Sequence, residues 1–149
     1  MMLNSLKICR MHFLGSHRYG GCEHIHIGDN CGMCNTLFNT SSGEIYVGDY
    51  TFTGHNVSII TGSHDIDEIN KKRQTAIARN NDILIGKGVW LCSNSVVLGP
   101  CIIDDNAVVA AGAVVLPGTH IESGEIYAGV PAKKVGNCSF SDNLGKADI

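Results

Sequence analysis

One histidine stands where the sequence changes character. Residues 63–82 form a polar stretch, SHDIDEINKKRQTAIARNND, directly after the apolar run Ile59-Ile60-Thr61-Gly62, and His64 is its second residue. An imidazole is the side chain best suited to accept a proton near neutral pH. Taken alone, a histidine in a polar loop is more often a solvated surface residue. A loop of this length in a compact domain is usually functional or disordered, so His64 is a residue whose chemistry depends on what this loop does.

A second group of residues has the composition of a metal site. Five cysteines and histidines fall close together in the chain: Cys22, His24, His26, Cys31 and Cys34. Cys31 and Cys34 have zinc-knuckle spacing, and His24 and His26 would share one face of a strand. Cys31 also falls on a small-residue position of the repeat described next, which a free thiol can fill. We therefore expect no metal site, with structural zinc as the alternative.

The chain between residues 85 and 121 repeats every six residues. One position is aliphatic throughout: Ile85, Leu91, Val97, Ile103, Val109, Val115 and Ile121. Four residues later stand Val89 and then small residues: Ser95, Cys101, Ala107, Ala113 and Thr119. A period of six fits neither an α-helix nor simple alternation and indicates a parallel β-helix, in which each hexad forms one face of a triangular prism. The aliphatic residues point inward, and three hexads complete a coil.

The same repeat is present before the polar stretch. It begins at residues 27–31, slips near residues 39–42 and resumes at Val47. Because per-repeat insertions tend to lie on the binding face, residues 63–82 are expected to be a functional loop insertion. The sequence therefore predicts an all-β domain.

The two ends of the chain depart from the repeat. Residues 1–20 are expected to form an irregular N-terminal cap or a partial coil, because a solenoid end exposes strand edges that something must cover. Pro131 is expected to stop strand pairing, and residues 137–149 to form a loose tail. We thus expect a single domain over residues 1–149 with a short C-terminal extension.

Composition excludes several classes of function. The chain is 44% hydrophobic and 17% charged with a formal charge of −3, which suits a globular domain without general affinity for nucleic acid. No apolar run approaches the roughly 20 residues of a membrane span. Lys7 and Arg10 interrupt the apolar N-terminus, which argues against a signal peptide. Cys31, Cys92 and Cys101 fall on repeat positions and are expected to be free thiols, which favours a cytoplasmic location.

Several segments together resemble one known family. In chain order they are Thr61-Gly62-Ser63-His64, Gly88-Val89-Trp90, Ala110-Ala111-Gly112-Ala113 and Ala128-Gly129-Val130-Pro131-Ala132-Lys133. With the hexads between them, they make residues 43–135 similar to the hexapeptide-repeat acyltransferases, in particular the sugar and polysaccharide O-acetyltransferases that include galactoside and maltose acetyltransferases. The resemblance implies a left-handed parallel β-helix, a hand that composition does not predict. It also implies acetyl-CoA as donor and a homotrimer with active sites between subunits.

The resemblance assigns the catalytic role to His64. It would deprotonate a hydroxyl of a sugar or glycan as that hydroxyl attacks the thioester of acetyl-CoA, in a ternary complex. Whether Asp65 orients the ring stays open. A covalent route through Cys92 is conceivable, but the repeat position of Cys92 favours an inert, packed thiol.

The resemblance also assigns the donor site. Trp90 would line the acyl-donor channel and Ser93 would lie near the donor sulfur. Small residues would let the pantetheine arm reach backbone amides, and further residues of the C-terminal segment would complete the site: Ala110, Ala111, Gly112, Ala113, Gly129, Lys133 and Lys134. The two lysines would meet the coenzyme phosphates. The residues alone allow other interpretations. Trp90 could be a corner residue that packs on the insertion, and the small residues at 110–113 could be required only by the geometry of the repeat. The two lysines could be a solvated basic pair.

The sequence departs from the family at two places. Leu116-Pro117 stands where many relatives carry Thr-Lys, so contacts to coenzyme A there are in doubt. Asn39 could match an acceptor-binding asparagine, but its spacing to His64 is shorter, so the role is not assigned to it.

Other functions stay open. The acceptor could be the nitrogen of an amino sugar or a sugar nucleotide. A zinc-binding or non-catalytic β-helix module belongs to another class. His55 and His64 are the only histidines in the central coils, too few for the three-histidine zinc site of β-helical carbonic anhydrases.

Overall fold

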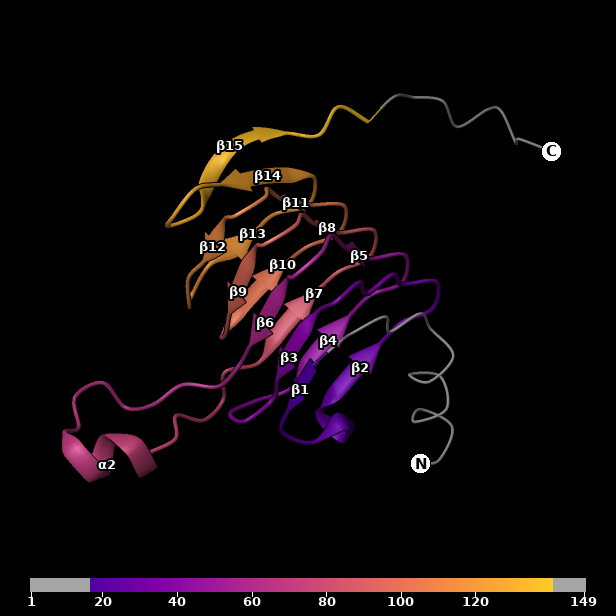
Figure 1. Ribbon diagram of the computed structural model, residues 1–149. Helices are drawn as coiled ribbons and strands as arrows, with labels where there is room; N and C mark the ends of the chain where they lie inside the picture. The colour runs from indigo at the N-terminus through magenta and orange to yellow at the C-terminus, as the bar shows by residue number, and fades with distance from the viewer. Residues whose placement is uncertain (1–16, 141–149) are drawn as a thin grey trace.

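The computed structural model describes residues 17–140, and these form a left-handed parallel β-helix (Figure 1). Sheet A contains β1 (His17–Tyr19), β3 (Leu37–Asn39), β6 (Ser58–Ile60), β9 (Val96–Leu98) and β12 (Val114–Val115). Sheet B contains β2 (Ile25–Ile27), β4 (Ile45–Val47), β7 (Ile83–Ile85), β10 (Cys101–Ile103) and β13 (His120–Ile121). Sheet C contains β5 (Phe52–Thr53), β8 (Trp90–Leu91), β11 (Val108–Val109), β14 (Glu125–Ala128) and β15 (Lys133–Asn137). The predicted fold class is confirmed.

Each coil passes through sheets A, B and C in turn and stacks on the coil before it. Ile83 pairs with Cys101 and Ile102 with His120, each eighteen residues apart, so the later coils are regular hexad triplets. The insertion does not shift this register: Ile45 of β4 pairs with Ile83 of β7, although the insertion lies between them in the sequence. Among the strands within residues 17–140, all pairs are parallel except β14 with β15. The chain therefore inserts residues without disturbing the ladder.

The predicted inward residues form the core. Leu91, Val97, Ile103, Val109, Val115 and Ile121 are fully buried, and Ile85 is 4% exposed. The small-residue position is buried as well, at Val89, Ser95, Cys101, Ala107 and Ala113. Corners between faces need positive φ, and Asn94, Asn106 and Gly112 supply it. The hexad reading is confirmed.

The three corners of the prism differ in how much chain they hold. The corner from sheet B to sheet C takes four residues in each central coil, at 48–51, 86–89 and 104–107. The corner from sheet C to sheet A, here called the C/A edge, also takes four, at 54–57, 92–95 and 110–113. The corner from sheet A to sheet B, here called the A/B edge, varies widely: residues 40–44, 61–82 and 99–100.

The polar insertion, residues 63–82, projects from the A/B edge as an arm (Figure 1). Its two limbs pair in antiparallel fashion at His64 and Ile77, and its tip carries the short helix α2 (Asn70–Thr75). Arg73 ties the turn by donating to the carbonyls of Glu68 and Ile66, at 2.6 and 3.0 Å. The insertion is thus an ordered hairpin, in which hydrogen bonds within the arm replace packing against the core.

The C-terminal segment differs from expectation. Pro131 does not end strand pairing: the chain reverses, and β15 pairs antiparallel with β14, covering the edge of sheet C. Proline removes only its own N–H, and the next residue, Ala132, still donates its N–H to Val114 O at 2.8 Å. Strand pairing therefore resumes directly after Pro131. Beyond β15 the N–H of Cys138 donates to Gly124 O at 2.7 Å, so the tail is still attached there. Residues 141–149, and the expected N-terminal cap over 1–16, lie outside the described residues.

Two general properties follow for residues 17–140. Within this range, none of the helices is both long and apolar enough to cross a membrane. Cys31 is buried with its thiol donating to Gly48 O at 3.1 Å, and burial raises the pKa of the Cys101 thiol to about 12. Both cysteines act as packed small residues of the repeat.

Candidate active site

A cavity of about 540 Å³ opens on the A/B edge at the root of the arm. Its lining comes from three consecutive coils and from the returning limb of the arm: His24, Thr40, Ser41, Ser42, Gly43, Glu44, Ile77, Arg79, Asn80 and Asp82. The lining is mainly hydroxyl, carboxylate and basic groups. Because it sits at the corner where the coils carry extra residues, the irregular part of the repeat is what builds it.

His64 lies on the cavity side of the arm. The bonds Asp65 N–H to Ala76 O (3.2 Å) and Ala78 N–H to Ser63 O (3.0 Å) flank the His64–Ile77 pair. This makes it a non-hydrogen-bonded antiparallel pair, whose two side chains project from the same face of the hairpin at close range. Ile77 lines the cavity, so the exposed His64 ring stands beside its entrance.

Asp65 does not orient the ring through any contact seen here. Its carboxylate accepts the N–H of Asp67 at 3.0 Å, closing a local turn. Adjacent residues of a strand point to opposite faces, which explains why sequence neighbours are not spatial partners.

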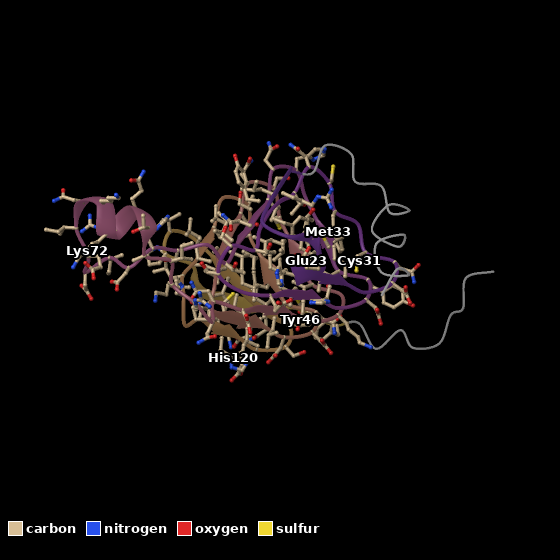
Figure 2. The ribbon with its side chains drawn as sticks, turned by 90° about the horizontal axis from the view of Figure 1, so that it is seen from below. Glu23, Cys31, Met33, Tyr46, Lys72 and His120 are labelled. Atoms are coloured by element: carbon tan, nitrogen blue, oxygen red, sulfur yellow. The ribbon has the colours of Figure 1, made fainter. Side chains whose placement is uncertain are left out.

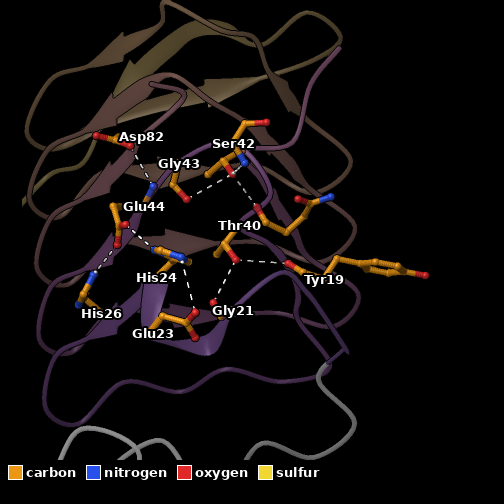
Figure 3. A network of polar contacts seen from close by, with 12 residues as sticks. Tyr19, Gly21, Glu23, His24, His26, Thr40, Ser42, Gly43, Glu44 and Asp82 are labelled. Carbon is orange, nitrogen blue, oxygen red and sulfur yellow. Dashed lines mark hydrogen bonds and ion pairs between the residues drawn. The ribbon is translucent and has the colours of Figure 1, made fainter. Parts of the chain in front are cut away.

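Glu44 is the centre of the polar network in the cavity (Figure 3). One carboxylate oxygen accepts from His24 Nδ1 at 2.6 Å and the other from His26 Nε2 at 2.8 Å. The hydrogen bonds lower the pKa of Glu44, and the bond from Glu44 raises the pKa of His24. The backbone N–H of Glu44 donates to Asp82 Oδ1 at 2.9 Å, joining three coils.

Two candidate residues for binding an acceptor were not predicted, namely Glu44 and Asp82. Both flank irregular corners, and no residue pattern marks them; only the stacking of coils places them together. Asn39 lies beside the segment that leads to His64. The N–H of Thr61, just after β6, donates to Asn39 O at 2.9 Å. Gly62 lies against the side-chain amide of Asn39.

The predicted donor residues gather along the C/A edge. Ser93 Oγ accepts the N–H of His55 at 3.0 Å, and Ser93 O accepts the N–H of Gly112 at 3.1 Å, so these corner residues stack directly. Gly129 lies at the same corner of the next coil. Its carbonyl oxygen accepts the N–H of Val114 at 3.0 Å, so it stacks next to the 110–113 corner. A Cβ on Gly112 would meet nothing within 4 Å, so the edge is open at this point.

The four small residues at 110–113 are not equivalent. Ala113 is fully buried and its N–H donates to Ala110 O at 3.1 Å, so its side chain belongs to the core. The N–H of Ala110 is also used, donating to Tyr127 O at 2.8 Å. Ala111 and Gly112 are exposed, and the N–H of Ala111 faces the Cys92 thiol. The hexad position of Ala113 thus points inward, whereas Ala111 and Gly112 lie at the surface.

Cys92 is not prepared as a nucleophile. Burial raises the pKa of its thiol, and the Ala111 N–H only partly opposes this effect. A thiol with a raised pKa has little thiolate at neutral pH.

Trp90 lies on the outer face of sheet C, next to the C/A edge. It is 45% exposed and stacks on Phe52 of the preceding coil, with ring centroids 5.7 Å apart. The arm leaves from the A/B edge, so Trp90 does not pack on the insertion of its own chain. The aromatic pair forms an exposed platform instead.

The two lysines have different surroundings. Lys134 Nζ lies 2.5 Å from Glu125 Oε1, and this contact lowers the pKa of Glu125 and raises that of Lys134. Lys133 is exposed on the neighbouring position of β15, and alternation points it to the opposite face. A phosphate could therefore meet Lys133 directly, whereas Lys134 already holds a carboxylate.

The five residues of the alternative zinc site do not converge. His24 lies in the short 3₁₀ helix η1 (Cys22–His24) rather than on a strand, and both histidines bind Glu44. Cys31 points into the core, while Cys22 is exposed. Over residues 17–140, no three His, Cys, Asp or Glu side chains form a group that could hold a metal ion.

Within one chain the catalytic and donor candidates stay apart. His64 lies on the A/B edge, while Ser93, Ala111, Gly112 and Gly129 lie on the C/A edge. Sheet A separates the two edges, as the positions of α2 and β8 in Figure 1 show.

Comparison with known proteins supports the hexapeptide-repeat fold. Residues 82–117 match the family described as bacterial transferase hexapeptide (six repeats). A galactoside O-acetyltransferase from Lactococcus lactis is 30% identical over 136 residues, which are 88% of this chain and 63% of the relative. The chain is a hexapeptide-repeat β-helix protein. Its resemblance to the hexapeptide-repeat acyltransferases is confirmed.

Solved structures agree with this identification. A maltose O-acetyltransferase from Clostridium difficile superposes with a TM-score of 0.72 at 25% identity, over 84% of this chain and 64% of that one. A galactoside acetyltransferase in complex with coenzyme A gives 0.71 at 23% identity, over 96% and 76%, which supports the fold. The hexapeptide-repeat protein spans less than two thirds of the length of the curated relatives, for example 54% of the Escherichia coli galactoside O-acetyltransferase.

Proposed function

We propose that this protein is an O-acetyltransferase that moves an acetyl group from acetyl-CoA to a hydroxyl of a sugar or glycan. The observation that carries the proposal is the pairing of two complementary edges around sheet A. One edge holds His64 beside a polar cavity of about 540 Å³, and the other holds an open strip of small residues. The relatives at 30% and 28% identity are named galactoside O-acetyltransferases, which supports the acyl donor and the acceptor class.

The proposed reaction is direct transfer in a ternary complex. His64 takes the proton of the acceptor hydroxyl as its oxygen attacks the thioester carbonyl carbon. The carbonyl oxygen becomes an oxyanion, which backbone N–H groups or a hydroxyl stabilise. When the tetrahedral intermediate collapses, the C–S bond breaks, and the imidazolium returns the proton to the leaving coenzyme A thiolate. The products are an acetyl ester and coenzyme A, and His64 is neutral again.

The acceptor would occupy the A/B cavity. Carboxylates and hydroxyls such as Glu44, Asp82, Ser41 and Ser42 are groups that accept and donate hydrogen bonds to sugar hydroxyls. The cavity reaches the face of the arm from which His64 projects. A hydroxyl held there can therefore approach the imidazole.

The donor would lie along the C/A edge of a second chain in a homotrimer. Over β3, β6, β9 and β12 the outer face of sheet A is mainly apolar: Leu37, Ile60, Val96, Leu98 and Val114 alternate with the inward core residues, and Asn39 and Ser58 are the polar members. If three copies turn this sheet toward a threefold axis, the A/B edge of each copy meets the C/A edge of the next. His64 of one chain then faces Ser93, Ala111 and Gly112 of its neighbour. Lys133 would bind the coenzyme phosphates.

A complementation experiment tests both the activity and the shared site. Acetyl transfer from acetyl-CoA is measured with galactose, maltose, glucosamine and a sugar nucleotide as acceptors. His64→Ala and the donor-edge variant Gly112→Val are then purified separately, unfolded together in equal amounts and refolded. Random mixing pairs an intact His64 with an intact donor edge at about one interface in four, so about a quarter of the wild-type rate should return. The assay is run at an acetyl-CoA concentration well below the raised KM of Gly112→Val, where each variant refolded alone should show much less activity than the mixture.

Three results would contradict the proposal. Wild type that transfers no acetyl group to any acceptor would refute the activity. Transfer only to the glucosamine nitrogen would replace the hydroxyl acceptor by an amine. No recovery in the mixture, or an active monomer in sedimentation equilibrium, would place the whole site within one chain.

A further inference from the structure

The outer face of sheet B carries a continuous ladder of exposed side chains. In register from the first coil to the last they are His26, Tyr46, Leu84, Ile102 and His120. The three central members are about two-fifths exposed: Tyr46 42%, Leu84 42% and Ile102 40%. Figure 2 views the prism from below, along the axis on which the coils stack. It shows Tyr46 and His120 on the same side of the prism, away from Lys72 at the tip of the arm.

This ladder has an apolar middle and polar ends. At one end His26 stacks on Tyr46, with ring centroids 4.5 Å apart, and donates to Glu44 at 2.8 Å. At the other end His120 Nε2 lies 2.8 Å from Asp104 Oδ2. Leu84 and Ile102 form the floor between them. An apolar floor with a few polar groups at its margins is the composition of a ligand site rather than of an ordinary solvated strand face.

A hollow of about 320 Å³ lies on this face beside the A/B edge. Its lining includes Asp82, Leu84, Pro100, Ile102, Thr119 and His120. Asp82 also lines the cavity of about 540 Å³ beside His64. Asp82 therefore lines both hollows, which places them next to each other on the surface.

We propose that the ladder on sheet B is an extended binding site for a glycan chain, which leads from the cavity at His64 toward His120. Sugar rings present apolar C–H faces and hydroxyl rims, which match the floor and margins of this groove. Strands lie about 4.8 Å apart, so five rungs span about 19 Å, roughly the length of four sugar units. The assignment rests on the proposed function, which places the reacting unit in the cavity.

The geometry favours a glycan over another copy of this chain as the occupant. In the proposed trimer, sheet A faces the axis and its two edges form the contacts, which leaves the middle of sheet B on the outside. The hollow on sheet B also shares Asp82 with the acceptor cavity, whereas none of its lining residues belongs to the donor edge. The proposal therefore adds subsites to the acceptor.

Binding of malto- and galacto-oligosaccharides of one to six units, measured by calorimetry without acetyl-CoA, tests this site. Wild-type affinity should rise at least about tenfold from one unit to four and then level off. Tyr46→Ser should remove most of this rise and leave binding of the single sugar unchanged. Tyr50→Ser is the matched control: Tyr50 is 64% exposed four residues later, at the corner toward sheet C, and its loss should not alter any affinity.

Ile102→Glu gives a second, independent test, because it places a charge on the floor. It should also abolish the rise with chain length. The melting temperature and the mass of the assembly are measured for each variant. Equal wild-type affinity for all lengths, or equal behaviour of Tyr46→Ser and Tyr50→Ser, would overturn the proposal. A changed assembly mass in Ile102→Glu would show that the face is a subunit interface and would overturn it as well.

Failure of this inference is distinguishable from failure of the proposed function. Acetyl transfer to single sugars without any dependence on chain length would refute the groove alone. Length-dependent binding without acetyl transfer would refute the enzyme activity and retain the groove.

Discussion

The two edges that border sheet A are built in opposite ways. The C/A edge takes four residues in every central coil, at 54–57, 92–95 and 110–113, and its corners stack on one another by regular hydrogen bonds. The A/B edge takes residues 40–44, 61–82 and 99–100 in the corresponding coils. A repeat of constant length makes a straight, open strip, whereas a repeat of variable length makes a cavity and an arm.

The difference matches what each edge would bind. A pantetheine arm is long and thin and needs close approach to backbone, which small corner residues allow. A sugar needs many directed hydrogen bonds, which come from side chains on irregular loops. The uniform edge therefore suits the donor that all members of such a family would share, and the variable edge suits an acceptor that differs between them.

His64→Ala gives the sharpest separation of the two edges and the largest expected effect. Loss of a general base lowers kcat by about 10² to 10⁴. The side chain is exposed on the arm, so the melting temperature should stay near that of wild type, and binding of acetyl-CoA should change little. Steady-state kinetics and calorimetry measure the two quantities.

Asp65→Asn is the control for His64→Ala. The Asp65 carboxylate closes a turn and does not touch the ring in this structure, so we expect activity within a few-fold of wild type. If His64→Ala folded, bound coenzyme A and kept near-normal acetylation, the A/B edge would not supply the base.

Gly112→Val should block the other edge. A Cβ there meets no atom within 4 Å, so the branched side chain would project into the donor strip and raise the KM for acetyl-CoA about tenfold or more. The positive φ of 68° adds strain of about 1–2 kcal/mol. Asn106→Val carries similar strain at φ 58° on the corner between sheets B and C, so it should lower stability equally with an unchanged KM. An equal rise in KM for both variants would mean that strain, not blockage, is responsible.

The two lysines test where the donor strip ends. Lys133→Ala should raise the KM for acetyl-CoA several-fold, and the effect should shrink as salt rises, because phosphate contacts are screened. Lys134→Ala should act mainly on stability, because it leaves the buried Glu125 carboxylate without its positively charged partner. Thermal melting and salt-dependent kinetics separate the two variants. Equal KM effects would show that the Lys134–Glu125 pair opens when coenzyme A binds.

Glu44→Gln tests the polar network of the A/B edge, and its expected effect on stability is the smallest of these predictions. The pKa of Glu44 is lowered and that of His24 is raised, chiefly by their mutual hydrogen bonds. The stability that Glu44 contributes is therefore present above the pKa of Glu44 in the unfolded chain and is lost as the pH falls through its folded pKa. The stability that His24 contributes is present below the pKa of His24 in the unfolded chain and is lost as the pH rises through its folded pKa. The substitution should lower the melting temperature by a few degrees near pH 5.5 and by less at pH 8.5. A difference that is the same at both pH values would show that the charged pair contributes nothing.

The sequence by itself determined the coil. Seven aliphatic residues at a spacing of six, from Ile85 to Ile121, leave only a prism with those side chains inside, and the structure buries all of them. It also located the arm, because a polar run of this length cannot continue a hexad, and it marked His64 at the start of that run. The family resemblance supplied the hand of the helix and the donor residues.

Only the tertiary structure decided which residues share an edge. Glu44, Asp82 and His24 are far apart in the chain and follow no pattern, yet stacking of unequal corners brings them into one cavity. The same stacking turned Ala113 into the core beside the exposed Gly112, and joined Lys134 to Glu125 through a β15 strand that Pro131 did not prevent. Hexad periodicity reports whether a side chain points inward, because that depends on position within a face. It carries no information on the lengths of the corners, and these set which coils meet and where a site can form.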